Sequence, residues 1–144
     1  MLLEGQEIIK EILSLLLTTP DTAFLIHCSM GKDQIGVVFA ILLSLAGVSA
    51  DVVAEEYSRS YSCLRETVPG IAAAIKKATV QELTDKEALG RAEVMIRTDK
   101  EAMVLTLRIV EERFGGVMQY LNGYCGVAVE ELSQLQDILT YTRS

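Results

Sequence analysis

The chain has 144 residues, half of them hydrophobic, and a formal net charge of −7 at pH 7. This is the size of one ordinary domain, so we predict a single domain over residues 1–144. The acidic charge argues against binding to nucleic acid and against attraction to anionic membranes.

The first predicted element is a helix over residues 3–17, where apolar side chains recur at helical spacing. Pro20 and its polar neighbours end it. The next apolar run, residues 23–26, is short and continuous, which is typical of a strand buried on both faces. No second strand is evident in the sequence. We therefore expect the edges of this strand to be covered by helices, by a second copy of the chain or by a partner chain.

Residues 27–36, which we call the cysteine loop, read HCSMGKDQIG and join this strand to an apolar helix over residues 36–46. Gly47 is the expected C-terminal stop of that helix. A loop of this kind directs backbone N–H groups at one point and lies at a helix N-terminus. Phosphate binds well there, and a thiol such as that of Cys28 loses its proton easily. We therefore expect a phosphate-like anion or a small-molecule ligand at the loop.

The remaining predicted elements are helices. Ser49 is expected to cap the first of them, and Thr84 and Thr98 each open a TDKE sequence that matches the capping box. We interpret the recurrence of TDKEA as two ordinary helix starts and not as an internal repeat. The predicted helices cover residues 51–59, 68–77, 98–113, 117–121 and 130–139. The longest apolar run, residues 37–48, is shorter than the roughly 20 residues that span a bilayer, so we expect no membrane span.

The three cysteines, Cys28, Cys63 and Cys125, have no regular spacing. An odd number without a pattern does not predict a disulfide framework, and none of them has neighbours at the spacing of a zinc site. With no secretory signal in view, we expect reduced thiols in the cytoplasm. We expect neither a metal nor another cofactor.

The cysteine loop resembles the signature of the protein tyrosine phosphatase superfamily, in which His-Cys is followed by five residues and an arginine. Gly31-Lys32-Asp33 is most similar to the tyrosine and lipid phosphatases of bacteria and fungi, whose loop reads HCxxGKDRTG. The similarity extends over nearly the whole chain. It implies an α/β fold by ancestry, without the N-terminal portion that carries most of the sheet. We therefore expect a mostly α chain, with one buried strand leading into the loop and its helix, followed by a helical C-terminal region.

This resemblance implies a role for each polar residue of the loop. Cys28 matches the nucleophile that attacks phosphorus; the alternative is a buried, inert cysteine. Asp33 matches an acid that protonates the leaving oxygen, or it only stabilises the helix dipole. His27, the only histidine, supports the cysteine in the family but could equally be a packed core residue. Lys32 adds positive charge near the phosphate, or it is merely solvated.

The resemblance also implies that the anion is bound by a run of loop residues, namely Ser29, Met30, Gly31, Lys32, Gln34, Ile35 and Gly36. The two glycines permit a tight backbone and a close approach to the anion.

Two positions of the loop depart from the family signature. Gln34 stands where the family has an arginine, which would grip the phosphate oxygens with a permanently charged fork. Ile35 replaces a hydroxyl residue that helps the cysteine to leave as a thiolate. We therefore predict weak or absent phosphatase activity. Two alternatives stay open: a pseudophosphatase that binds a phosphate or a protein partner, and a repurposed enzyme that uses Cys28 and Asp33 on a substrate without phosphate.

Overall fold

The computed structural model describes residues 2–80 and 82–141. These residues form eight α-helices and one short 3-10 helix, with no strand among them. In chain order the helices are α1 (Gln6–Thr18), α2 (Asp33–Leu45), α3 (Ala50–Leu64), η1 (Arg65–Thr67), α4 (Val68–Ala78), α5 (Asp85–Met95), α6 (Lys100–Phe114), α7 (Val117–Gly123) and α8 (Val129–Thr140).

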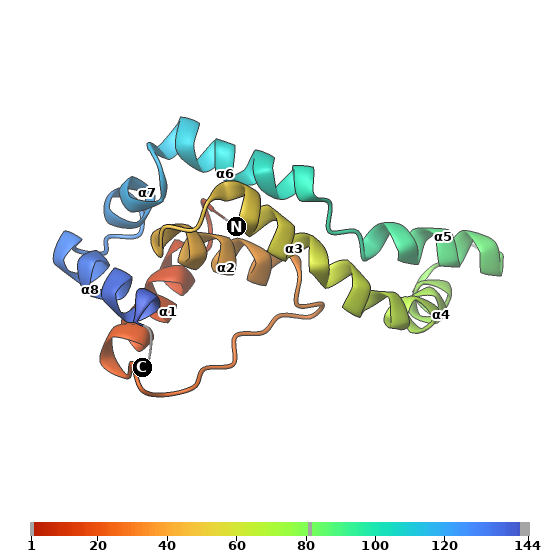
Figure 1. The fold of residues 1–144 in the computed structure, drawn as a ribbon. Coiled ribbons are helices and arrows are strands. Elements are labelled where there is room, and N and C mark those ends of the chain that lie inside the picture. The colour runs from red at the N-terminus through yellow and green to blue at the C-terminus, as the bar shows by residue number, and fades with distance from the viewer. Residues whose placement is uncertain (1, 81, 142–144) are drawn as a thin grey trace.

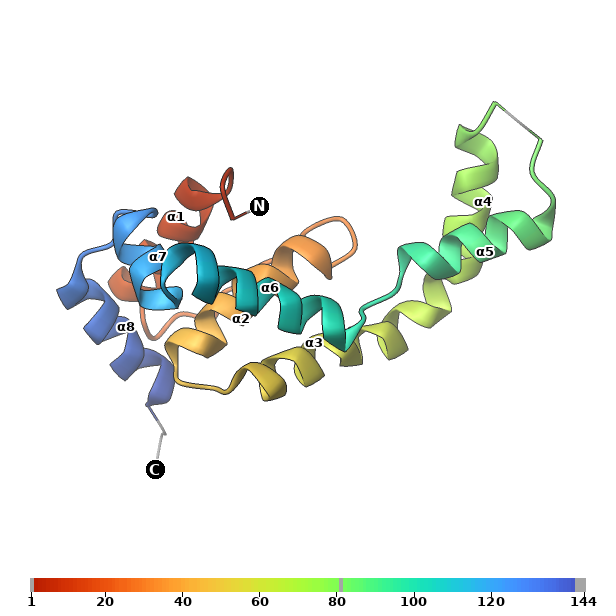
Figure 2. The same cartoon turned by 90° about the horizontal axis from the view of Figure 1, so that it is seen from above.

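The helices form a body and an arm (Figure 1). The body consists of α1, α2, α6, α7 and α8, with α3 packed against both α2 and α6. Beyond the body, α3 continues outward to the arm, residues 65–96, in which α4 packs along α5. Seen from above, the arm projects from one end of the molecule at the tip of α3 (Figure 2).

Three clusters of buried apolar side chains follow this division. The largest lies in the body and joins α1, α2, α6, α7 and α8; its fully buried members are Ile9, Leu13, Ile41, Leu45, Val110, Tyr120, Leu121, Leu132 and Leu135. A second joins α2, α3 and α6. The third holds α4 against α5 in the arm. Helix α2 contributes to the first two clusters, which explains why its sequence is apolar nearly all round.

The predicted buried strand at residues 23–26 is wrong. This stretch belongs to a drawn-out connection between α1 and α2 that bows away from the helices (Figure 1). The side chain of Leu25 is 87% exposed and that of Phe24 is 38% exposed, while Ile26 packs against the core of the body. A strand needs a neighbour for its backbone groups, and the described residues offer none. Of the α/β expectation, the structure confirms only that the chain is mostly helical.

Helix α2 begins within the cysteine loop, at Asp33, which is earlier than the predicted start at residue 36. Its C-terminal stop is confirmed: Gly47 has a φ of +84°, a conformation that favours glycine. The N–H of Gly47 donates to the carbonyl of Ser44 at 3.0 Å, and that of Val48 donates to the carbonyl of Leu43 at 2.9 Å. These two bonds form a Schellman motif, which satisfies carbonyls at the end of the helix.

The two TDKEA segments have different structures. Thr84 caps α5 as predicted, because its hydroxyl accepts from the Glu87 N–H while the Glu87 carboxylate accepts from the Thr84 N–H. The second predicted capping box is wrong. Helix α6 starts after Asp99, and the Thr98 hydroxyl instead donates to the carbonyl of Ser58 on α3 at 3.1 Å.

The other predicted helices are present with shifted ends. Helices α1, α4, α7 and α8 agree with the predicted ranges to within three residues, whereas α3 extends to Leu64. Ser49 occupies the N-cap of α3, but its side chain makes no capping hydrogen bond, so that part of the prediction is wrong. Within the part of the chain that the structure describes, no helix is long and apolar enough to cross a membrane.

Candidate functional site

Cys28 lies at the end of the drawn-out connection, immediately before the turn that enters α2, and is partly exposed. Hydrogen bonds from the backbone N–H groups of Ile35, Gly31, Met30 and Lys32 converge on its sulfur. Desolvation raises the pKa of the Cys28 thiol, but these four hydrogen bonds outweigh it, so the pKa lies below the usual value of a cysteine. Cys28 is therefore not a buried cysteine, and its role as a nucleophile stays a prediction.

The turn that brings these N–H groups together depends on Gly31. Its φ of +66° places it in the left-handed region, and a Cβ added there would meet no atom within 4 Å. A side chain would therefore fit sterically but would strain the backbone.

Lys32 does not point into solvent. Its side chain is 9% exposed, and its ammonium donates to Asp33 Oδ1 at 2.7 Å and to the backbone carbonyl of Arg97 at 3.2 Å. The expectation of a merely solvated lysine is therefore wrong. Asp33 opens α2 with a carboxylate that is 68% exposed and bound to Lys32. Whether Lys32 also contacts a bound anion stays a prediction.

Tyr57 of α3 covers the first turn of α2. A Cβ built on Gly36 would lie 2.7 Å from Tyr57 Cε2, so this close packing requires glycine. Burial raises the pKa of the Tyr57 phenol, and the carboxylates of Asp33 and Asp99 raise it further, while Lys32 opposes them. Tyr57 thus lies within the electrostatic reach of the loop's charged pair.

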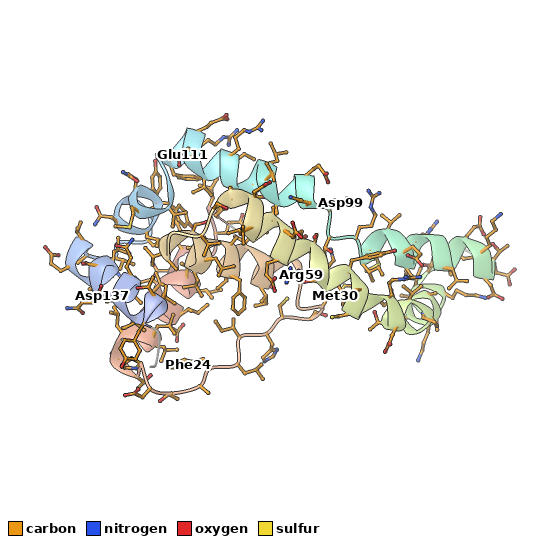
Figure 3. The ribbon with its side chains drawn as sticks, in the orientation of Figure 1. Phe24, Met30, Arg59, Asp99, Glu111 and Asp137 are labelled. Atoms are coloured by element: carbon orange, nitrogen blue, oxygen red, sulfur yellow. The ribbon has the colours of Figure 1, made fainter. Side chains whose placement is uncertain are left out.

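The other loop residues differ in exposure. His27, Ser29 and Gln34 are exposed, so the expectation of a packed core histidine is wrong. Met30 is partly buried against the apolar cluster of the arm. In Figure 3 it lies beside the outer part of α3, at the opposite end of the connection from Phe24.

A cavity of about 300 Å³ opens beside the loop between α2 and α3. Gly31, Ile35 and Gly36 form its loop side, and Phe39 and Tyr57 are among the side chains that complete it. A larger cavity of about 600 Å³ lies between α6, α7 and the C-terminal end of α2, but it contains no residue of the cysteine loop. Of these two cavities, the smaller one borders the cysteine loop, through Gly31, Ile35 and Gly36.

The two other cysteines lack such an environment. Cys125 is buried, and this burial raises the pKa of its thiol despite a hydrogen bond with Tyr120 that lowers it. Cys63 is exposed on α3. Among the residues that the structure describes, no group of three or more His, Cys, Asp or Glu side chains could hold a metal ion.

A model of the tyrosine phosphatase family matches residues 1–141. The chain belongs to the tyrosine phosphatase family. This membership confirms the family that the cysteine loop indicates, and it covers all eight α-helices.

One curated relative in the family is the triple specificity protein phosphatase PtpB of Mycobacterium tuberculosis. It is 26% identical to this chain over 124 residues, which is 80% of the chain and 43% of the relative. The chain thus spans less than half the length of this relative. Its activity belongs to that larger protein and does not by itself define what the shorter chain does.

The structure brings backbone groups of the predicted site residues to Cys28, but it does not bring all of their side chains there. Four loop residues direct N–H groups at Cys28, whereas the Lys32 and Asp33 side chains bind each other. The position of Tyr57 beside the loop could not be predicted, because nothing in its local sequence distinguishes it from other tyrosines of a helix. Tyr57 comes to lie beside Gly36 only because α3 packs against α2.

Proposed function

We propose that this protein is a tyrosine phosphatase family member that keeps a reactive cysteine in an anion-binding loop but has weak or no phosphatase activity. One observation carries the proposal. The backbone N–H groups of Met30, Gly31, Lys32 and Ile35, which we call the cradle, bind the sulfur of Cys28. The position at which the family has its arginine is occupied by the neutral side chain of Gln34.

The size of the expected loss follows from the chemistry of phosphoryl transfer. The arginine fork binds two phosphate oxygens and stabilises the charge that spreads over the transferred group. Loss of one preorganised neutral donor in a comparable site lowers the rate about 100- to 1000-fold, and loss of a full charge lowers it at least as much. Ile35 adds to this, because it cannot supply the hydroxyl that the family has at this position.

The test is the restoration of the missing groups. Gln34→Arg, alone and with Ile35→Thr, is assayed on an aryl phosphate beside the wild type. We expect little turnover by the wild type, and at least a 100-fold gain in kcat/KM for the double variant. Adding Cys28→Ser to the double variant should abolish that gain. Cys28-dependent turnover by the wild type at a rate equal to that of the double variant would contradict the proposal.

The cradle also supports a binding role without catalysis. Backbone N–H groups and a helix N-terminus bind phosphate whether or not an arginine follows. Calorimetry with inorganic phosphate, vanadate and a phosphotyrosine peptide tests this pseudophosphatase alternative. If none of them binds, the loop has no anion-binding function.

The lowered pKa of Cys28 supports the third alternative, in which Cys28 and Asp33 act on a substrate without phosphate. Fast alkylation of Cys28 by iodoacetamide near neutral pH, without turnover of aryl phosphate, would favour it. Sluggish alkylation would count against a repurposed enzyme and against the reactive cysteine itself.

A partner chain is favoured by a separate observation. None of the hydrogen bonds among the described residues involves residues 23–27, and Phe24 and Leu25 expose apolar surface there. We propose that an extended segment of a second polypeptide pairs with this stretch, because unpaired backbone beside apolar side chains is a template for strand addition. A monomer mass by light scattering at micromolar concentration would exclude a second copy of the chain as that polypeptide.

A further inference from the structure

The ammonium of Lys32 occupies an unusual place for a lysine. It is nearly buried, and a buried charge is tolerated only where it is paired and hydrogen-bonded. Two of its three donors are used, one by the Asp33 carboxylate and one by the carbonyl of Arg97. Arg97 is 65 residues away in sequence, so this bond fastens the cysteine loop to a distant part of the chain.

That distant part is the short connection between α5 and α6. It is anchored a second time by Thr98, which is 4% exposed and donates its hydroxyl to the Ser58 carbonyl of α3 at 3.1 Å. Met30 adds an apolar contact, because it packs against the cluster that joins α4 and α5. The loop is therefore attached on both sides of Gly31: Met30 contacts the arm, and Lys32 bonds to the connection that joins the arm to α6.

We propose that Lys32 is a positioning residue, which fastens the cysteine loop to the α5–α6 connection and thereby holds the loop's N–H groups on Cys28. The proposal rests on the reactive cysteine of the proposed function. The side chain of Lys32 aligns the cradle by holding the α5–α6 connection, and Thr98 in turn holds that connection against α3. In this role the ammonium does not bind the anion.

The geometry of residue 32 explains how the side chain acts. The N–H of Lys32 is one of the four that stabilise the thiolate, so a fixed side chain also fixes the direction of that N–H. An ammonium that turned to a phosphate would leave the Arg97 carbonyl and the Asp33 carboxylate without this donor. With Gln34 neutral, the cradle then acts on an anion through its backbone dipoles.

The experiment measures the alkylation of Cys28 by iodoacetamide as a function of pH, with the Cys28 peptide quantified by mass spectrometry. Lys32→Met keeps much of the buried stem and removes the ammonium. Thr98→Val is uncharged, does not touch the loop and removes only the second anchor. Lys86→Met, on the exposed face of α5, removes an equal charge without touching either contact.

We expect both Lys32→Met and Thr98→Val to move the alkylation midpoint to higher pH. The rate near pH 7 should fall about 3- to 10-fold in each, since one pKa unit changes the thiolate fraction about tenfold. Lys86→Met should keep the wild-type profile. Circular dichroism checks that each variant is folded, and Thr98→Val alone decides the matter if Lys32→Met does not fold.

Two outcomes would overturn the assignment. In one, Lys32→Met weakens vanadate binding while both alkylation profiles stay at the wild-type midpoint, which would make Lys32 an anion ligand. In the other, both variants lose only thermal stability. An ordinary cysteine profile in the wild type is a third, separate result: it would contradict the reactive cysteine of the proposed function before the role of Lys32 is tested.

Discussion

At the scale of single residues, the tightest constraint near the site is the contact between Gly36 and Tyr57. The ideal Cβ position on Gly36 lies 2.7 and 2.8 Å from two ring carbons of Tyr57, closer than real contacts allow. Glycine inside a helix costs about 1 kcal/mol relative to alanine. The molecule therefore gives up helix stability in α2 to bring α3 against the first turn after the loop.

Gly36→Ala should destabilise the protein by about 1–3 kcal/mol, because overpacking of a filled contact outweighs the gain in helix propensity. Gly90→Ala is the matched control. It also lies inside a helix, but a Cβ there meets nothing within 4 Å, so this variant should gain up to about 1 kcal/mol. Urea unfolding of both variants measures the two effects. Equal stabilisation by both would show that Tyr57 yields at no cost.

The sequence locates the cysteine loop well because consecutive residues form it. Cys28, Gly31 and the N-terminus of α2 are all supplied within a few positions, so the N–H cradle follows from local structure. The direction of the Lys32 side chain does not, because it is decided by the Arg97 carbonyl, which arrives with another helix. The sequence shows that a charged side chain lies in the loop, whereas the group that this side chain binds is decided by the packing of distant segments.

At the scale of helices and their connections, the repeated TDKEA shows the same limit. Both copies satisfy the capping-box pattern, yet only Thr84 uses it. Thr98 bonds to the Ser58 carbonyl because α6 packs along α3 and the connection between α5 and α6 is thereby buried against α3. A local motif predicts a helix start where the residue stays exposed, and tertiary contacts override it where the residue is buried.

The arm should lose stability in acid, because two of its carboxylates have lowered pKa values in the folded state. A side-chain hydrogen bond and the charge of Lys76, with Nζ 2.6 Å from Asp85 Oδ1, lower the pKa of Asp85 below 3.8. Hydrogen bonds from Thr84 lower the pKa of Glu87 below 4.5. A lowered pKa in the folded state means that the stabilisation is present at higher pH and is lost as pH falls through the folded pKa. The arm should therefore weaken progressively below about pH 4.

Lys76→Met tests this dependence. The variant should be less stable than the wild type at pH 6, and this difference should shrink as pH falls through the lowered pKa of Asp85 and the carboxylate that binds Lys76 becomes protonated. Urea unfolding followed through the amide signals of α5 by NMR reports the arm directly. A constant difference between the two proteins across this pH range would show that Lys76 acts through packing and not through Asp85.

At the scale of the whole molecule, the helical body could be predicted, whereas the exposed connection at residues 23–26 could not. The apolar periodicity of α1, α2 and α8 indicates buried helices, and their packing into one core confirms it. The apolar run at residues 23–26 predicts a buried strand only if a neighbour exists, and no local signal tells whether one does. Without a neighbour, the same residues form an exposed connection.

Limited chymotrypsin digestion should cut this connection first. Phe24 and Leu25 are exposed and lack hydrogen bonds to other described residues, which is the condition for access by a protease. Phe39 is 47% exposed but lies inside α2, so its peptide bond should resist cleavage. Mass spectrometry of the earliest fragments identifies the site. A first cut elsewhere in the chain would show that the connection is protected in solution.

The exposed connection runs directly into Cys28, so the two share one stretch of backbone. A polypeptide that pairs with residues 23–27 would restrict the same backbone that positions the Cys28 thiol against the N–H groups of the loop. Binding at the two places is then thermodynamically coupled, and such coupling is reciprocal. If the pairing partner tightens an anion at the loop by some factor, the anion tightens the partner by the same factor. An anion bound beside Cys28 would thereby report whether the partner is bound to residues 23–27.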